Sequence, residues 1–298
     1  MGRTLLVSDR RWSWRDWTRE HLAGRDLVVL DPSCTDFGPA TRLLLVRVGK
    51  VAEWAHIGSP DPLHDPVALV AGASRLLALA GDDALVQLFP WRWSPLGRHI
   101  ALQLAQTCGL DSVLVPVGSG LENQPWPVGA EAVELTESFP PMVQEAQRRA
   151  QWIDLLEKAE RHGVDLASAS LVGSRLGSGV PVAIGMEGAY AEACGGTLLM
   201  VTDTPLGDAE VARAMDLAHA HRSQVVSPSA YVGLVCSLAH QDGSDFGLGV
   251  VDSLDFGRKV AHIRALAVAP APVRILKLGT VRIDAVGKEI EDLKPWAV

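Results

Sequence analysis

Asp26-Leu27-Val28-Val29-Leu30-Asp31, an unbroken apolar run between two acids, decides the fold class of this chain. A strand that is buried on both faces of a parallel sheet reads as a continuous apolar run, whereas a half-exposed strand alternates apolar and polar residues. The run therefore predicts a buried parallel strand with an acid, Asp31, at its end.

Further strands and helices alternate along the chain on both sides of this run. Val67, Val70, Leu76 and Leu77, for example, recur at helical spacing and predict a helix. Strands that alternate with helices predict an α/β fold with a doubly wound parallel sheet covered on both faces. The predicted strands cover 3–8, 26–31, 43–48, 84–88, 112–116 and 132–135, and the predicted helices cover 12–23, 66–80, 96–108 and 141–162.

The character of the sequence changes after Gly163. A glycine-rich stretch, a strand at 197–201 and a helix at 208–221 lead into short β-type runs separated by Gly, Pro and Asp turns, which are typical of a small barrel or sandwich. We therefore expect an α/β domain over 1–163, a junction segment over 164–222 and a β-rich domain over 223–298. The predicted runs of the last domain are 231–238, 246–252, 260–267, 273–278 and 281–284.

Charge and composition exclude several classes of protein. The net charge is −8, and a protein whose main task is to coat nucleic acid is usually basic, so any nucleic-acid contact must be local. No run of about 18 uncharged apolar residues occurs, and the N-terminus does not resemble a secretory signal, so no membrane contact is expected. The four cysteines form no C-x-x-C pair, which favours reduced thiols in a cytoplasmic protein over a zinc site.

The β-rich tail carries the most specific pattern in the chain. Its parts are 231–234 (YVGL), 246–250 (FGLGV), 252–256 (DSLDF), 277–284 (KLGTVRID) and 287–289 (GKE). This pattern resembles the C-terminal domain of the polyribonucleotide 5′-hydroxyl kinase family, which includes cleavage-factor and pre-ribosomal-RNA kinases.

Earlier segments resemble the same family in the same order. Asp31 followed by Gly38-Pro39 is similar to the family's acid-ended strand and G-Q-S-x-x-G-P-P loop, and Gly58-Ser59-Pro60 is similar to its V-G-S-x-S-P segment. Residues 171–179 and Tyr190 resemble two further stretches. The resemblance implies a P-loop-kinase-like domain followed by a small β-rich domain, with Asp31, Gly38 and Ser59 near the ligand.

The phosphate-binding loop of that family is absent. A P-loop needs G-x-x-x-x-G-K-[ST] after the first strand, so that backbone N–H groups, a lysine and a hydroxyl hold phosphate and Mg²⁺. This chain has Ser8-Asp9-Arg10-Arg11-Trp12-Ser13-Trp14-Arg15-Asp16 there, without glycine, and its first lysine is Lys50. Ser13, Arg15 and Asp16 thus occupy a degenerate cofactor position, and no cofactor is expected.

A second nucleotide motif is also replaced. Where the family has D-T-x-G, this chain has Gln87-Leu88-Phe89-Pro90, so the acid and hydroxyl that would order Mg²⁺ are missing. Two lost motifs point to abandoned phosphoryl transfer, although a divergent chemistry remains the alternative.

The candidate site residues each have a structural alternative. Asp31, with Arg148 and Arg149 at the position of the family's lid arginines, would form the catalytic set, but an acid at a strand end also serves as a cap and two helix arginines usually form a solvated face. Trp12, Trp14, Trp91 and Arg92 interleave aromatic and cationic groups. They could fill the vacant pocket, form a protein-binding hot spot or stack on single-stranded RNA. No histidine or cysteine has metal-ligand spacing, so no metal site is expected.

These observations leave three functions open. The first is a catalytically degenerate homologue of RNA 5′-hydroxyl kinases, a pseudokinase that acts as a binding or scaffolding component in RNA processing, with a protein partner or a second copy. The second is an active kinase that uses Mg·ATP through a rebuilt phosphate site in which Arg15, Asp31 and Arg148 act. The third is a regulatory protein that binds RNA and does no chemistry.

Overall fold

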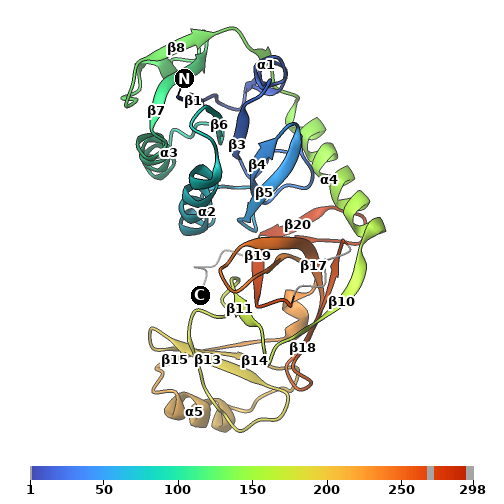
Figure 1. Cartoon of the computed structure of the whole chain (residues 1–298). Helices are drawn as coiled ribbons and strands as arrows, with labels where there is room; N and C mark the ends of the chain where they lie inside the picture. The colour runs from blue at the N-terminus through green and yellow to red at the C-terminus, as the bar shows by residue number, and fades with distance from the viewer. Residues whose placement is uncertain (1, 267–271, 293–298) are drawn as a thin grey trace. The chain divides into compact units, whose positions relative to one another are not determined.

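The computed structural model describes residues 2–266 and 272–292 and divides the chain into two compact units, Met1–Gln151 and Trp152–Val298. Each unit has its own hydrophobic cores. Figure 1 labels the elements of both units. Along the described residues, no helix has the length and apolar character needed to cross a membrane.

Unit 1 is built on a seven-stranded sheet whose strand order is β5-β4-β3-β6-β1-β7-β8. The expected parallel strands are present at its centre, but β4 and β5 form an antiparallel hairpin, so the sheet is mixed and not wholly parallel. The hairpin was not predicted, because β5 lies at the sheet edge, where exposed and half-buried residues mix, and so it lacks the continuous apolar run of a buried strand. The strands are β1 (Arg3–Leu6), β3 (Asp26–Leu30), β4 (Arg42–Arg47), β5 (Lys50–His56), β6 (Ala84–Leu88), β7 (Leu110–Pro116) and β8 (Ala130–Val133).

Side chains of the central strands alternate between two cores, as the period of two in a strand requires. Val28 and Leu30 face the core that contains α2 (Pro66–Leu79) and α3 (Pro95–Thr107), whereas Leu27 and Val29 face the core that contains Trp14, next to α1 (Arg15–His21). Both large helices begin at proline, and a side chain caps each one. The cap of α2 is Asp65, which accepts a hydrogen bond from Ala68 N at 2.8 Å, and the cap of α3 is Ser94.

Unit 2 contains a seven-stranded, mainly antiparallel sheet. Its main path is β10-β18-β17-β16-β19-β11, and β20 (Glu289–Asp292) pairs with β19. The two predicted runs 273–278 and 281–284 form one long strand, β19, and β18 ends before residue 267, which lies outside the described residues. The bounds are β10 (Glu160–Asp165), β11 (Ser170–Val172), β16 (Leu234–Ala239), β17 (Asp245–Asp255), β18 (Val260–Ala265) and β19 (Ile275–Ile283).

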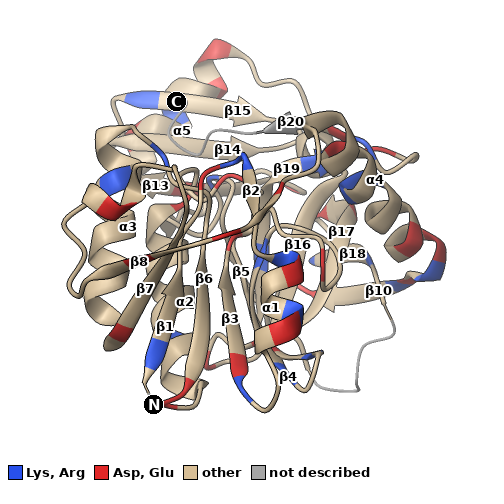
Figure 2. Ribbon diagram, turned by 90° about the horizontal axis from the view of Figure 1, so that it is seen from above, with Lys and Arg blue, Asp and Glu red and all other residues tan. Residues whose placement is uncertain are grey.

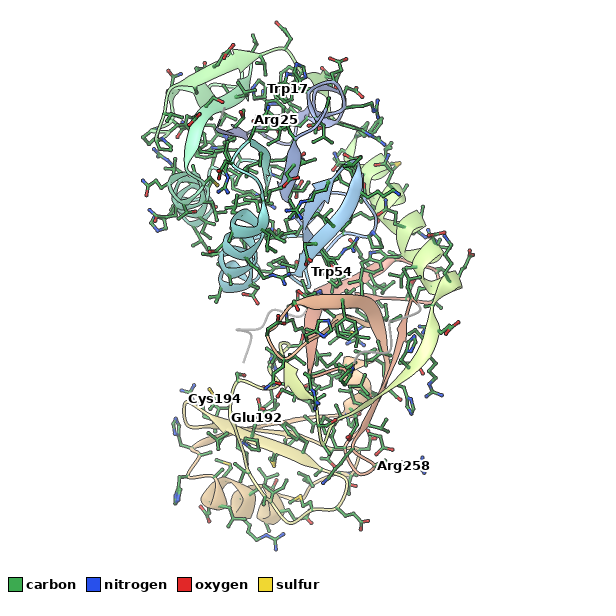
Figure 3. All side chains as sticks on the ribbon, in the orientation of Figure 1. Trp17, Arg25, Trp54, Glu192, Cys194 and Arg258 are labelled. Carbon is green, nitrogen blue, oxygen red and sulfur yellow. The ribbon has the colours of Figure 1, made fainter. Side chains whose placement is uncertain are left out.

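A second sheet of unit 2 occupies the segment expected to be a junction. Its order is β12-β13-β14-β15, and the parallel pair β14 and β15 is connected through α5 (Asp208–Leu217). Buried Glu192 on β13 accepts hydrogen bonds from Tyr190 Oη at 2.7 Å and Gly177 N at 2.9 Å, which ties the glycine-rich stretch to this sheet (Figure 3). The strands are β12 (Val180–Pro181), β13 (Tyr190–Cys194), β14 (Thr197–Val201) and β15 (Arg222–Val226).

The end of the first domain also differs from the prediction. The helix expected over 141–162 ends at Lys158 as α4 (Pro141–Lys158), and Glu160–Asp165 pairs with β18 as strand β10. Trp152 is fully buried, and its indole N–H lies 3.3 Å from Glu289 Oε1 in unit 2. The chain thus divides between residues 151 and 152, whereas the sequence predicted boundaries at 163 and 222.

Candidate functional site

A cleft of about 400 Å³ opens in unit 1 at the carboxyl ends of β1, β3 and β6. This is the edge at which open α/β sheets bind ligands, and the volume lies within the range of small-molecule sites, roughly 300–1,000 Å³. Ser8 and Asp31, which come after β1 and β3, and Gln87, near the end of β6, all line it. Among the predicted site residues, the lining includes Asp31, Arg148, Ser13, Arg15, Trp12, Trp14 and Arg92.

The loop after β1 does not have the conformation of a phosphate-binding loop. Its backbone donors are used internally: Arg11 N donates to Asp9 Oδ1 at 2.9 Å, Trp12 N to Asp9 O at 3.3 Å and Arg15 N to Ser13 Oγ at 3.3 Å. In the described part of the chain, no residue before Gly24 has a positive φ. N–H groups that already have acceptors cannot wrap a phosphate, so this loop lacks the backbone grip that defines a P-loop.

A short strand pair fixes this loop in place. β2 (Trp12–Ser13) pairs antiparallel with β9 (Thr136–Glu137), and Ser138 N donates to Arg11 O at 2.8 Å. The pairing brings Ser138 and Phe139 to the cleft, together with residues of the first turns of α4. A strand of two residues is too short to show any periodicity, so no sequence pattern predicts this pair.

The tryptophans have different positions, although the sequence groups them. Trp14 is 2% exposed and Trp91 is 3% exposed, and each belongs to one of the two cores of unit 1. Trp12 is half-buried and lines the cleft, whereas Trp93 is 65% exposed. Trp14 and Trp91 therefore contribute to the cores and leave the cleft open.

Asp31 is the buried acid of the cleft. It is 8% exposed, and burial raises the pKa of its carboxyl group above the ordinary value of 3.8. Hydrogen bonds from Ser33 N at 3.0 Å and Ser33 Oγ at 2.7 Å, and the charges of Arg92 and Arg10, offset only part of that effect. The carboxyl group can thus exchange a proton closer to neutral pH than an exposed aspartate.

Arginines at the cleft form ion pairs with acidic side chains. Arg15 Nε lies 3.2 Å from Asp36 Oδ1, and Arg92 Nη2 lies 3.3 Å from Asp61 Oδ2. Arg10 is exposed and makes no hydrogen bond or ion pair with any residue that the structure describes. Figure 2 marks basic residues in blue and acidic residues in red, and both kinds line the cleft. The charged lining consists of Arg10, Arg15, Arg92, Arg148, Asp9, Asp31, Asp36, Asp61 and Glu145.

Five predicted site residues lie outside the lining. Trp91 is in the core, and Ser59 is fully buried, with its Oγ accepting from Asp61 N at 3.0 Å. Asp16 pairs with Arg19 at 3.2 Å on the surface of α1. Gly38, which has φ of 113°, and Arg149 on α4 are likewise not part of the cleft wall.

Five charged residues of the lining were not among the predicted site residues: Asp9, Arg10, Asp36, Asp61 and Glu145. Asp36 follows β3, a predicted strand, so the position of an acid after that strand was the available signal, whereas Asp61 follows β5, which was not predicted. Within the described ranges, no group of three or more His, Cys, Asp or Glu side chains has the arrangement of a metal site.

Unit 2 has a separate polar cleft of about 490 Å³. It lies at the carboxyl ends of β14 and β15 and extends to the β17–β18 turn, where Arg258 is found (Figure 3). None of the predicted site residues lines it.

Comparisons with known proteins agree with the fold. No protein-family model matches the chain, and no curated protein matches its sequence. A solved structure of the wild-type Clp1p–Pcf11p complex matches with a TM-score of 0.56 and 11% identity, over 94% of this chain and 74% of the matched chain. A second Clp1p–Pcf11p structure, which concerns ATP loss in a point mutant, matches with a TM-score of 0.54 and 11% identity, over 94% and 75%.

At 11% identity this likeness establishes the fold alone. The chain has a Clp1p-like architecture, with an α/β unit followed by a β-rich unit, which confirms the predicted fold class in this coarser form.

Proposed function

We propose that this protein is a catalytically degenerate relative of RNA 5′-hydroxyl kinases that works as a binding or scaffolding component and does not transfer phosphate. The loop after β1 carries the proposal. It has no glycine, no lysine and no positive φ, and the N–H groups of Arg11, Trp12 and Arg15 are bound within the loop itself. The loop offers a nucleoside triphosphate neither the backbone N–H donors nor the lysine ammonium group with which P-loop sites bind phosphate.

The charge of the cleft supports the same proposal. A phosphate site gains affinity from cations that have no other partner, but Arg15 and Arg92 already pair with Asp36 and Asp61. Five acids and four arginines line the cleft, so its own carboxylates oppose a polyanion.

Both structural neighbours were solved as complexes with a protein, Pcf11p, and one of them concerns the loss of ATP from a Clp1p point mutant. By analogy of fold, we extend to this chain a role that depends on a protein partner.

Transfer of labelled γ-phosphate from ATP to a 5′-hydroxyl RNA oligonucleotide tests the catalytic part of the proposal. We expect no transfer above the background without protein, in the wild type and in Asp31→Asn alike. Transfer by the wild type that falls in Asp31→Asn would instead establish the active-kinase alternative.

The open cleft favours a second candidate, the retention of single-stranded RNA without chemistry. Half-buried Trp12 and unpaired Arg10 lie in the same cleft, and stacking on an aromatic side chain contributes about 1–3 kcal/mol per base.

Neighbouring arginines provide a matched test of this second candidate. Arg10 is unpaired, whereas Arg11 is bound to Asp9 at 2.6 Å, and each alanine variant removes the same charge. If RNA occupies the cleft, Arg10→Ala will weaken binding of a short oligonucleotide in fluorescence anisotropy more than Arg11→Ala does. Equal losses would indicate only non-specific attraction.

A further inference from the structure

Trp93 is an exposed aromatic side chain with a rigid support. Its ring packs edge-on against buried Trp91, with 5.9 Å between ring centroids and an interplanar angle of 81°, yet 65% of Trp93 is exposed. Trp93 neither fills a core nor lines the cleft. A pre-ordered tryptophan at the surface is the residue type that most often dominates a protein interface.

Three further apolar side chains are exposed on the helices beside it. Val67 and Val70 on α2 are 79% and 44% exposed, and Leu96 on α3 is 50% exposed. α2 and α3 pack together on one face of the sheet (Figure 1), and both begin at its carboxyl edge. We call Val67, Val70, Trp93 and Leu96 the α2–α3 patch.

The orientation of α2 places Val70 on the side of α3. Gly72 packs against Ala55 and Leu43, and Arg75 Nη2 donates to Trp54 O, so this side of the helix faces β4 and β5. Val70 lies about 160° around the helix from Gly72, on the opposite flank, and Val67 points outward between the two flanks.

The outer face of α2 is unusually apolar. Arg75 is the only charged residue of α2, and the exposed positions Ala71, Ser74 and Ala78 extend the patch without adding charge. A helix that is apolar on all sides is normally buried. The patch and these three residues together expose on the order of 500 Å², near the upper end of the largest apolar patches on monomeric proteins, which are often functional.

We infer that the α2–α3 patch is the interface of a symmetric dimer of this chain. Two such faces bury on the order of 1,000 Å² in total, about the minimum for a specific interface. The four residues of the patch carry no charge, so two copies of this acidic chain can pair there without burying like charges against one another. A two-fold pairing of one face with itself is also the commonest arrangement of soluble oligomers. The inference does not depend on the loss of nucleotide binding.

Sedimentation velocity on the full chain between about 1 and 100 μM tests the inference, because an interface of this size is at the weak end of specific interfaces. We expect a monomer–dimer equilibrium whose dissociation constant rises at least ~100-fold in Val67→Asp, because the aspartate would be buried without a partner. Trp93→Ala should weaken the dimer as well. Thermal melts of both variants would check that they fold.

Val48→Asp is the matched control. Val48 is a 96% exposed valine of the same unit, but it lies in the β4–β5 turn at the opposite edge of the sheet from the start of α2. The dimer should persist in Val48→Asp. A wild type that is monomeric at every concentration, or an equal effect of Val48→Asp and Val67→Asp, would overturn the inference.

Discussion

Among individual residues, Asp31 is the clearest example of a cleft side chain that lowers the stability of the folded state. Its carboxyl group is buried, and the Ser33 hydrogen bonds and neighbouring arginines do not offset the burial, so its pKa stays raised. Because the native state then binds more protons than the unfolded state above pH 3.8, Asp31 lowers the stability of the fold as pH rises through its native pKa.

Asp31→Asn should therefore stabilise the protein at pH 7 by about 0.5–2 kcal/mol, the usual gain from one stabilising substitution. Chemical denaturation at pH 3.5 and pH 7 measures this, and the gain should be larger at pH 7. A variant that is less stable than the wild type at pH 7 would show that the charged carboxylate contributes to the fold.

Trp14 and Trp12 are two residues apart, but they should respond very differently to truncation. Trp14 is packed among Leu6, Leu27 and Val29, so Trp14→Ala should cost about 3–5 kcal/mol of unfolding free energy. Half-buried Trp12 faces the cleft, and Trp12→Ala should cost clearly less. Urea denaturation of both variants decides this, and equal losses would mean that Trp12 is a core residue.

The difference between these two residues also defines what the sequence could predict about the site. The acid at the end of β3 was predictable, because a buried parallel strand places its last residue at the ligand edge. The burial of Trp14 and Trp91 was not, since alternating Trp and Arg residues give the same pattern whether the rings face a core or a cleft.

At the scale of elements, the loop between β1 and α1 is held by Asp9. Its carboxylate accepts from Arg11 N, Nε and Nη2 at 2.9, 2.9 and 2.6 Å. Burial acts to raise the pKa of Asp9, but these bonds and the charge of Arg11 bring it below the ordinary value of 3.8. The stability that Asp9 contributes is thus present above pH 3.8 and is lost as pH falls through its native pKa.

Asp9→Ala should release the loop. We expect faster hydrogen exchange at the Arg11 amide and a loss of about 1–2 kcal/mol, the usual cost of removing a charged hydrogen-bond partner. Exchange of amides in β16 serves as the internal reference and should not change. Unchanged exchange at Arg11 would mean that the β2–β9 pair alone holds the loop.

The elements that the sequence did predict share one property, a continuous or strictly periodic apolar pattern. β3, β6, β14, α2 and α3 were all expected close to their observed bounds. β5, with the sequence KVAEWAH, was missed because it has neither a continuous apolar run nor a strict alternation, and β10, Glu160–Asp165, was missed because it continued the charged pattern of α4. Their pairing with distant strands is a tertiary effect that overrides local preference.

At the scale of the whole chain, two units with separate cores carry separate clefts. The order of motifs along the sequence predicted a kinase-like body, and the structural neighbours confirm that body as a fold. The function of this kinase-like unit depends on a few residues after β1. A likeness in fold does not determine what those residues do.

The most direct test of the proposed loss of nucleotide binding is the thermal stability of the full chain with and without Mg·ATP. A ligand present at 100 times its dissociation constant stabilises a protein by about 2.7 kcal/mol, which for a chain of this size raises the melting temperature by several degrees. We expect no change in melting temperature at millimolar Mg·ATP. A rise of several degrees would show that the chain binds the nucleotide, against the proposed function.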